Sequence, residues 1–120
     1  MSLKLTPELI AAAYDYLKVA DPFRGWGLPE ADDLGFIVSR HKDRYGHMIG
    51  YHRSPDADIA MSEKKIGSTT VLITVMAHEM IHLYQHLRGT TTPNTQHNAE
   101  FLRLAKRVCK IHVFDYVAFI

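Results

Sequence analysis

Apolar residues recur at helical spacing in three segments of the chain, over residues 6 to about 19, 68 or 69 to 88, and 96–98 to about 111. The first segment opens with Thr6, Pro7 and Glu8, a capping hydroxyl followed by two residues that suit the first turn of a helix. The second ends before Gly89, a typical residue for a helix stop. The pattern therefore predicts three helices, and the second is apolar on most of its faces.

Between the first two helices, the pattern changes to short apolar and β-branched segments separated by polar turns. These segments cover residues 36–39, 45–51 and 58–62, and their composition is typical of strands. Residues 21–33 contain two prolines and two glycines, which indicates a loop or a short helical turn. We expect a small, mostly antiparallel sheet of about three strands. We also expect the apolar tail 113–120 to pack on the domain as a strand.

Length and composition favour one α+β domain over residues 1–120. The chain has 120 residues, of which 47% are hydrophobic and 22% are charged, an ordinary balance for a single core. A net charge of +1 excludes attraction to nucleic acid or membranes by overall charge alone. The apolar runs are too short for a membrane span, and the N-terminal segment does not resemble a signal peptide. We therefore expect a cytoplasmic protein with no membrane partner.

The second predicted helix carries a polar stripe on a surface otherwise suited to burial. His78, His82 and His86 recur at every fourth residue, and Glu79 adjoins the first of them. Burying such groups costs free energy unless they find partners. Residues 78–82 match H-E-x-x-H, and imidazoles four residues apart on a helix can bind one zinc ion. Glu79 lies about 100° around the helix from His78, where its carboxylate can act as general base on a zinc-bound water.

A catalytic zinc ion usually has three protein ligands and one open position, so a third ligand is expected. His86 is roughly 12 Å from His78 along the helix axis. It is too far away to complete the site and should extend the polar face into solvent or a substrate groove. His97 opens the third helix after a loop long enough to fold back over the second, and Glu100, one turn later, could bind instead. We favour His97, with Glu100 as a hydrogen-bonding partner near the site or a solvated acid.

The order of these residues resembles the SprT-like metalloprotease domain. That family's pattern of H-E-x-x-H followed by H-G-x-E-F has counterparts here in His78, Glu79, His82, His97, Glu100 and Phe101. The segment IAMSEKKI also looks like the family's strand leading into the active helix, and the resemblance spans roughly residues 45–110. Asn98 stands where the family usually has glycine, and with one cysteine we expect no zinc ribbon like that of many members within residues 1–120.

The resemblance implies a zincin-like fold, with about three helices packed on the sheet and the motif on the central helix. It also implies a Zn²⁺ ion held by His78, His82 and His97, and hydrolysis of protein or peptide substrates, some of them associated with DNA. Glu79 would be the general base, and an edge strand within residues 45–62 could align the substrate backbone. The alternative is a non-catalytic, zinc-stabilised binding or regulatory domain. Glu79 argues against it, because a purely structural site needs no base.

Weaker signals concern the rest of the site and its partners. Four residues are candidate oxyanion donors: Tyr45, His47, Tyr51 and Tyr84. The single cysteine, Cys109, excludes an internal disulfide and a cysteine-based zinc ribbon, and we expect it to be a small buried or half-buried side chain. One broad face of the third helix either keeps the protein soluble or binds the phosphates of single-stranded DNA through Arg103, Lys106, Arg107 and Lys110.

Overall fold

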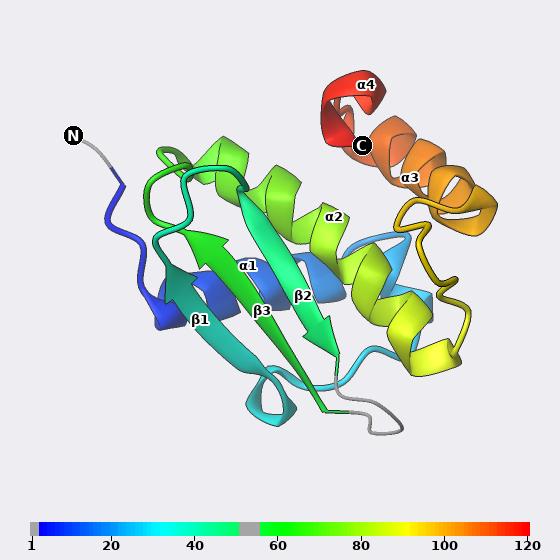
Figure 1. The fold of residues 1–120 in the computed structure, drawn as a ribbon, viewed down its shortest axis with the longest axis horizontal. Helices are drawn as coiled ribbons and strands as arrows, with labels where there is room; N and C mark the ends of the chain where they lie inside the picture. The colour runs from blue at the N-terminus through cyan, green and yellow to red at the C-terminus, as the bar shows by residue number, and fades with distance from the viewer. Residues whose placement is uncertain (1–2, 51–55) are drawn as a thin grey trace.

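The computed structural model describes residues 3–50 and 56–120 (Figure 1). The helices are α1 (Pro7–Lys18), α2 (Thr69–Arg88), α3 (Ala99–His112) and the short α4 (Tyr116–Phe119), and the strands are β1 (Gly35–Ser39), β2 (Gly46–Gly50) and β3 (Ala57–Ser62). Two 3₁₀ turns, η1 (Phe23–Gly25) and η2 (Ala31–Asp33), occupy the segment rich in proline and glycine. The predicted α+β class, with three longer helices on a small three-stranded sheet, is confirmed. Within the described residues, none of these helices has the length and apolar character needed to cross a membrane.

Short-range signals place the ends of the three long helices close to their predicted positions. The Thr6 hydroxyl accepts a hydrogen bond from the backbone N–H three residues further on, and the Ser68 hydroxyl caps α2 in the same way. Gly89 ends α2 in the left-handed region at φ 70°, where glycine carries no steric penalty. Asn98 caps α3, so this helix begins at Ala99, just after the predicted start.

The sheet is mixed, with strand order β1-β3-β2. β2 and β3 are antiparallel, whereas β1 and β3 are parallel, so the expected mostly antiparallel arrangement holds for one of the two strand pairs. The reason is that β3 turns back beside β2 and enters the space between β1 and β2. Ser62, at the end of β3, holds the segment that connects β1 to β2. Its N–H donates to the Tyr45 carbonyl, and its hydroxyl donates to the His41 carbonyl. β2 is left as an edge strand.

Helix α2 lies directly against β2, and two glycines allow this close approach. A Cβ atom at Gly46 would lie 3.1 Å from Val75 Cγ1 and 2.8 Å from the Ala60 oxygen, and one at Gly50 would overlap the ring of His86. Gly46 therefore faces the middle of α2, and Gly50 faces a position about three turns further on. The helix and the strand consequently run in the same direction. Figure 1 shows them side by side, with α3 on the other side of α2.

One hydrophobic core joins the sheet to the three long helices. Its fully buried members come from each of these parts and include Tyr14, Ile59, Met76 and Phe101. Cys109 belongs to the same core, as predicted. This packing holds α2 between β2 and α3, and the polar stripe of α2 lies at that junction.

The apolar tail packs on the domain, but the prediction that it forms a strand is wrong. Within it, Tyr116–Phe119 form α4, which begins after Asp115, whose carboxylate accepts the Val117 N–H at 3.1 Å. The Phe119 N–H donates to the Asp115 carbonyl. Apolar character alone does not distinguish a strand from a short helix, and here these local hydrogen bonds favour the helix. Phe119 is buried, and α4 packs on α2 and α3.

Candidate metal centre

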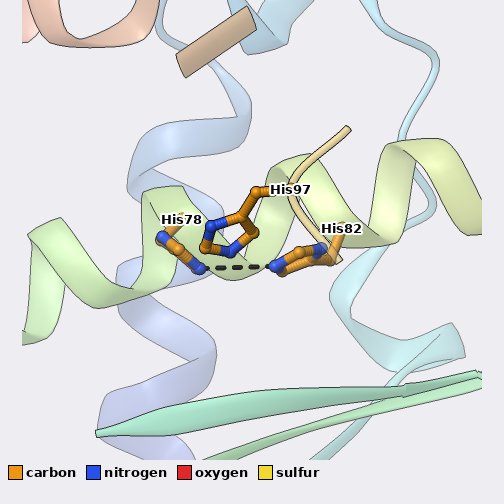
Figure 2. A group of neighbouring side chains, drawn as sticks. All are labelled: His78, His82 and His97. Carbon is orange, nitrogen blue, oxygen red and sulfur yellow. Dashed lines mark hydrogen bonds between the residues drawn. The ribbon is translucent and has the colours of Figure 1, made fainter. Parts of the chain in front are cut away.

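Three imidazole rings converge where α2 meets the start of α3 (Figure 2). His78 and His82 come from successive turns of α2, and His97 comes from the residue before the N-cap of α3. One ring nitrogen of each histidine lies within 4.8 Å of the others, and the Nε2 atoms of His78 and His82 are 3.3 Å apart. The three side chains are therefore close enough to hold one metal ion.

The spacing and the charge state of these rings suit zinc. Two nitrogens that bind zinc tetrahedrally at about 2.0–2.1 Å lie roughly 3.3–3.4 Å from each other, which matches the separation between His78 and His82. Burial lowers the pKa of His78 to about 4 and that of His82 to about 3, and it also lowers the pKa of His97. The rings are therefore neutral near pH 7, and neutral imidazole is the form that binds metals.

The tail of the chain orients the first of these rings. The Nδ1 atom of His78 lies 2.7 Å from the Phe119 carbonyl oxygen, so Nδ1 carries the proton and donates this hydrogen bond. This tautomer leaves the Nε2 lone pair unprotonated and available to a metal. No local sequence pattern indicates the contact, because the two residues are 41 positions apart.

Phe101 contacts all three rings. Its ring is nearly parallel to that of His97, with 4.2 Å between centroids and 6° between planes, and it stacks on His82 at 4.6 Å. The His78 ring meets it edge-on at 5.1 Å. Because Phe101 is fully buried in the core, these contacts couple the positions of the rings to the packing of α3.

A hydrogen-bond network anchors the loop that carries His97. Gln85, near the end of α2, is only 1% exposed, and its amide donates to Asn98 Oδ1 at 2.9 Å and to Glu100 Oε1 at 3.0 Å. The Thr90 hydroxyl also donates to Glu100, and the Asn98 amide donates to the Thr90 carbonyl. Both ends of the loop are thus tied together around one buried amide, and His97 lies directly before Asn98.

Glu100 accepts hydrogen bonds from the network that holds this loop, and it lies outside the cluster of ring nitrogens. Hydrogen bonds from Thr90 and Gln85 lower the pKa of its carboxyl, which keeps it charged at neutral pH. Among the described residues, the group that could hold a metal contains the histidine of the loop and not Glu100. His86 is also absent from that group, and its ring lies against Gly50.

Glu79 lies beside the three rings, where α2 faces β2. Burial raises the pKa of its carboxyl to about 8, while the backbone N–H of Met48 and the charge of Arg44 oppose this shift. A divalent cation on the neighbouring rings would favour the charged carboxylate, as any nearby opposite charge does. Glu79 is therefore a buried carboxylate with a hydrogen-bond donor that holds it in place.

Two cavities flank Glu79 and together form a cleft beside β2. The larger has a volume of about 470 Å³ and is bordered by polar residues of the loop 91–96. The smaller has a volume of about 210 Å³ and is bordered by residues 118–120 of the tail. Gly46, His78 and Glu79 line both cavities, so a ligand in either one would approach the same carboxylate.

The candidate oxyanion donors take different positions relative to this cleft. Tyr45 lines the smaller cavity and His47 lines the larger one. Tyr84 packs against Trp26, with 4.5 Å between ring centroids, and lines neither of the two. Tyr51 lies outside the described residues. Tyr45 and His47 are thus the described candidates that border the cleft.

Two groups that build the site were missed by sequence analysis. Gln85 did have a signal, since it lies one turn after His82 and continues the polar face of His78 and His82 along the helix. The Phe119 carbonyl had none, because a backbone acceptor looks the same at every position. Asn98 has an ordinary extended backbone at φ −74°, which any residue adopts, so the site does not require glycine there.

Comparison with known proteins tests the family resemblance directly. Among curated proteins, no relative matches this sequence. The SprT-like family model, however, matches residues 23–117, a range that includes the three histidines, Glu79 and the loop network. Because this match covers most of the 120 residues, the chain belongs to the SprT-like family.

Proposed function

We propose that this SprT-like protein is a zinc-dependent endopeptidase that hydrolyses peptide bonds in protein substrates. The observation that carries the proposal is the convergence of three neutral imidazoles beside a buried carboxylate in a cleft. A purely structural zinc site is closed and needs no acid–base group. Here Glu79 lines both cavities of the cleft, where a substrate can reach it. Membership of the family supports the same function.

The chemistry divides between the histidines and Glu79. His78, His82 and His97 would hold a zinc ion, which when bound polarises the scissile carbonyl and lowers the pKa of a water molecule. Glu79 takes a proton from the attacking water and returns it to the departing amine. Burial alone raises the pKa of Glu79, and a divalent cation on the neighbouring rings would favour the charged form that accepts a proton. The Met48 N–H holds the carboxylate in position.

The free edge of β2 borders Glu79 and can align a substrate backbone. The Tyr45 carbonyl accepts the Ser62 N–H of β3, and the backbone groups of successive strand residues point to opposite edges. Gly46 and Met48 therefore direct their backbone groups to the free edge. Because the Met48 N–H bonds Glu79, that edge lies beside the carboxylate. An extended peptide that adds to it would bring its carbonyl groups past the three histidines.

Glu79→Gln tests this mechanism, because an amide cannot accept the proton and the three ligands stay intact. The variant should keep about one zinc ion per chain and hydrolyse an unfolded protein roughly 10²- to 10⁴-fold more slowly. Glu8→Gln makes the same change at an exposed residue of α1 and is the matched control. Cleavage by Glu79→Gln at the parental rate would exclude Glu79 as the base, and a parent that binds no zinc would refute the proposal as a whole.

We also propose that the basic face of α3 binds single-stranded DNA and so brings DNA-associated proteins to the cleft. Its four basic residues are all exposed: Arg103, Lys106, Arg107 and Lys110. Binding through phosphates should weaken with salt, with a slope of about −0.7 per contact for single strands. An oligonucleotide titration at low and moderate salt measures this slope. Absence of binding at low salt, or binding that salt does not weaken, contradicts the proposal.

A further inference from the structure

The smaller cavity beside Glu79 has the dimensions of a site for one side chain. Its volume is about 210 Å³, and apart from the site residues its walls include Tyr45, Gly46, Thr74, Val75, Ala118 and Ile120. Pockets for whole small-molecule ligands typically have volumes of roughly 300–1,000 Å³. The cavity is thus too small for such a ligand, and it opens next to Glu79, the proposed general base.

The walls of this cavity favour an apolar occupant. Thr74 donates its hydroxyl to the Thr70 carbonyl at 2.8 Å, so it needs no partner from a ligand. Among the described residues that line the cavity, Glu79 is an acid that the proposed mechanism already uses, and none is Lys, Arg or Asp. The Lys65 ammonium lies 4.6 Å from the centre of the half-exposed ring of Tyr45, which is a wall residue. This nearby positive charge disfavours a basic side chain in the cavity. The larger cavity differs, because it contains Arg44 and the polar loop.

The direction of β2 decides which residue of a bound peptide meets this cavity. Antiparallel addition to a strand edge is slightly more stable than parallel addition and more common. β2 and α2 run in the same direction, with Gly46 beside Val75 and Gly50 beside His86. An antiparallel peptide therefore has its amino-terminal part toward Gly50 and its carboxyl-terminal part toward Gly46. The residue after the scissile bond consequently meets the smaller cavity, whose walls include Gly46 and Val75.

We propose that the smaller cavity binds the side chain on the carboxyl side of the cleaved bond and selects a medium-sized apolar residue such as leucine or methionine. This inference rests on the proposed endopeptidase function and gives it a substrate class. The tail limits the size of the side chain, because Ala118 and Ile120 form part of the wall. The same tail orients His78 through the Phe119 carbonyl. One segment of the chain thus supports the metal site and also shapes the subsite.

Zinc-binding hydroxamates test the preference without requiring turnover. The series HONH–CO–CH₂–CH(R)–CO–NHCH₃, with R as hydrogen, methyl, isobutyl, benzyl or aminobutyl, differs only in the side chain offered to the cavity. In the zinc-loaded protein, the isobutyl compound should bind at least about tenfold more tightly than the hydrogen or aminobutyl compound, since one methylene in an apolar pocket is worth roughly that much. Equal affinities across the series, or tightest binding of the aminobutyl compound, would overturn the inference.

Substitutions at two neighbouring residues of α4 test whether the side-chain preference of the hydroxamate series arises in the smaller cavity. Ala118→Phe fills the cavity from an exposed position and should reduce the affinity of the isobutyl compound about tenfold, to that of the hydrogen compound. Val117→Phe is the matched control, because Val117 is 80% exposed and does not line the cavity, and it should leave the series unchanged. Zinc content is measured in both variants. If Ala118→Phe retains its isobutyl affinity with zinc bound, the inference is wrong.

A second variant keeps the test decisive if Ala118→Phe disturbs the tail and loses zinc. Val75→Ala enlarges the cavity from α2 and should shift the preference from isobutyl to benzyl. An unchanged order of affinities in Val75→Ala would refute the subsite.

Cleavage of a defined peptide mixture separates this inference from the proposed function. The cuts should precede leucine, methionine and residues of similar size. Cleavage with no preference at this position would refute the subsite and retain the endopeptidase. Side-chain-dependent hydroxamate binding with no cleavage of any peptide would support the subsite and refute the endopeptidase.

Discussion

The buried amide of Gln85 allows a direct measurement of how strongly the loop network controls the metal site. Gln85→Leu preserves most of the volume of a side chain that is 1% exposed, and it removes both of its hydrogen bonds. The bond to Asn98 joins neutral groups and is worth about 0.5–1.5 kcal/mol, and the bond to the Glu100 carboxylate is worth about 1.5–3 kcal/mol. Each acceptor keeps another donor, namely the Phe101 N–H and the Thr90 hydroxyl. The free energy of unfolding should therefore fall by about 2–3 kcal/mol, in the lower part of the summed range.

Loss of these hydrogen bonds should also weaken zinc binding, because His97 lies directly before Asn98 in the loop. In the parent protein the network holds this loop in place before zinc binds, whereas in the variant zinc has to order it. A cost of about 2–3 kcal/mol corresponds to an affinity change of at most about 30- to 140-fold. Groups that support a metal ligand typically contribute about 10- to 100-fold. We therefore expect Gln85→Leu to bind zinc about 10- to 100-fold more weakly.

Two assays on the same variant separate stability from positioning. Urea unfolding of the metal-free protein measures the change in stability, and competition with a fluorescent chelator measures zinc affinity. Gln96→Leu is the matched control, because it makes the same change at an exposed residue beside His97, and its zinc affinity should equal that of the parent. If Gln85→Leu loses the expected stability but keeps zinc affinity within about twofold, the network does not position His97 and this reasoning is refuted.

Three further predictions concern the core and the ligand set. Phe101→Ala should lower the free energy of unfolding by about 3–5 kcal/mol, measured by urea titration, because it empties a fully buried site; a loss below about 1 kcal/mol would contradict the packing described. His97→Ala should weaken zinc binding far more than Glu100→Gln, because only the histidine belongs to the ring cluster, and the opposite ranking in a competition titration would make Glu100 the third ligand. Tyr14 is fully buried, its hydroxyl donates to the Pro29 carbonyl at 2.6 Å, and burial raises its pKa above the ordinary 10.0. The unfolded chain therefore loses this proton first, so stability present below about pH 10 should fall as the pH rises further. Tyr14→Phe should flatten that part of the pH–stability profile, and an unchanged profile would show that other groups cause the fall.

The sequence by itself determined those features that depend on short-range interactions. The ends of α1 and α2 follow from capping at Thr6 and Ser68 and from the left-handed Gly89, and each of these acts within one turn of helix. The four-residue interval between His78 and His82 likewise places both rings on one face of α2. Family membership could be predicted for the same reason, since the motif residues lie at fixed intervals along the chain.

Only the tertiary structure decided which distant groups meet. Loop length allowed either His97 or Glu100 to reach the two rings of α2, and it was the buried amide of Gln85 that engaged Glu100 and left the histidine at the site. The parallel pairing of β1 with β3, the helical form of the tail and the Phe119 carbonyl on His78 were likewise absent from any local pattern. Hydrogen bonds and packing between residues tens of positions apart form only when the whole chain closes around one core, so these contacts have no local sequence signature.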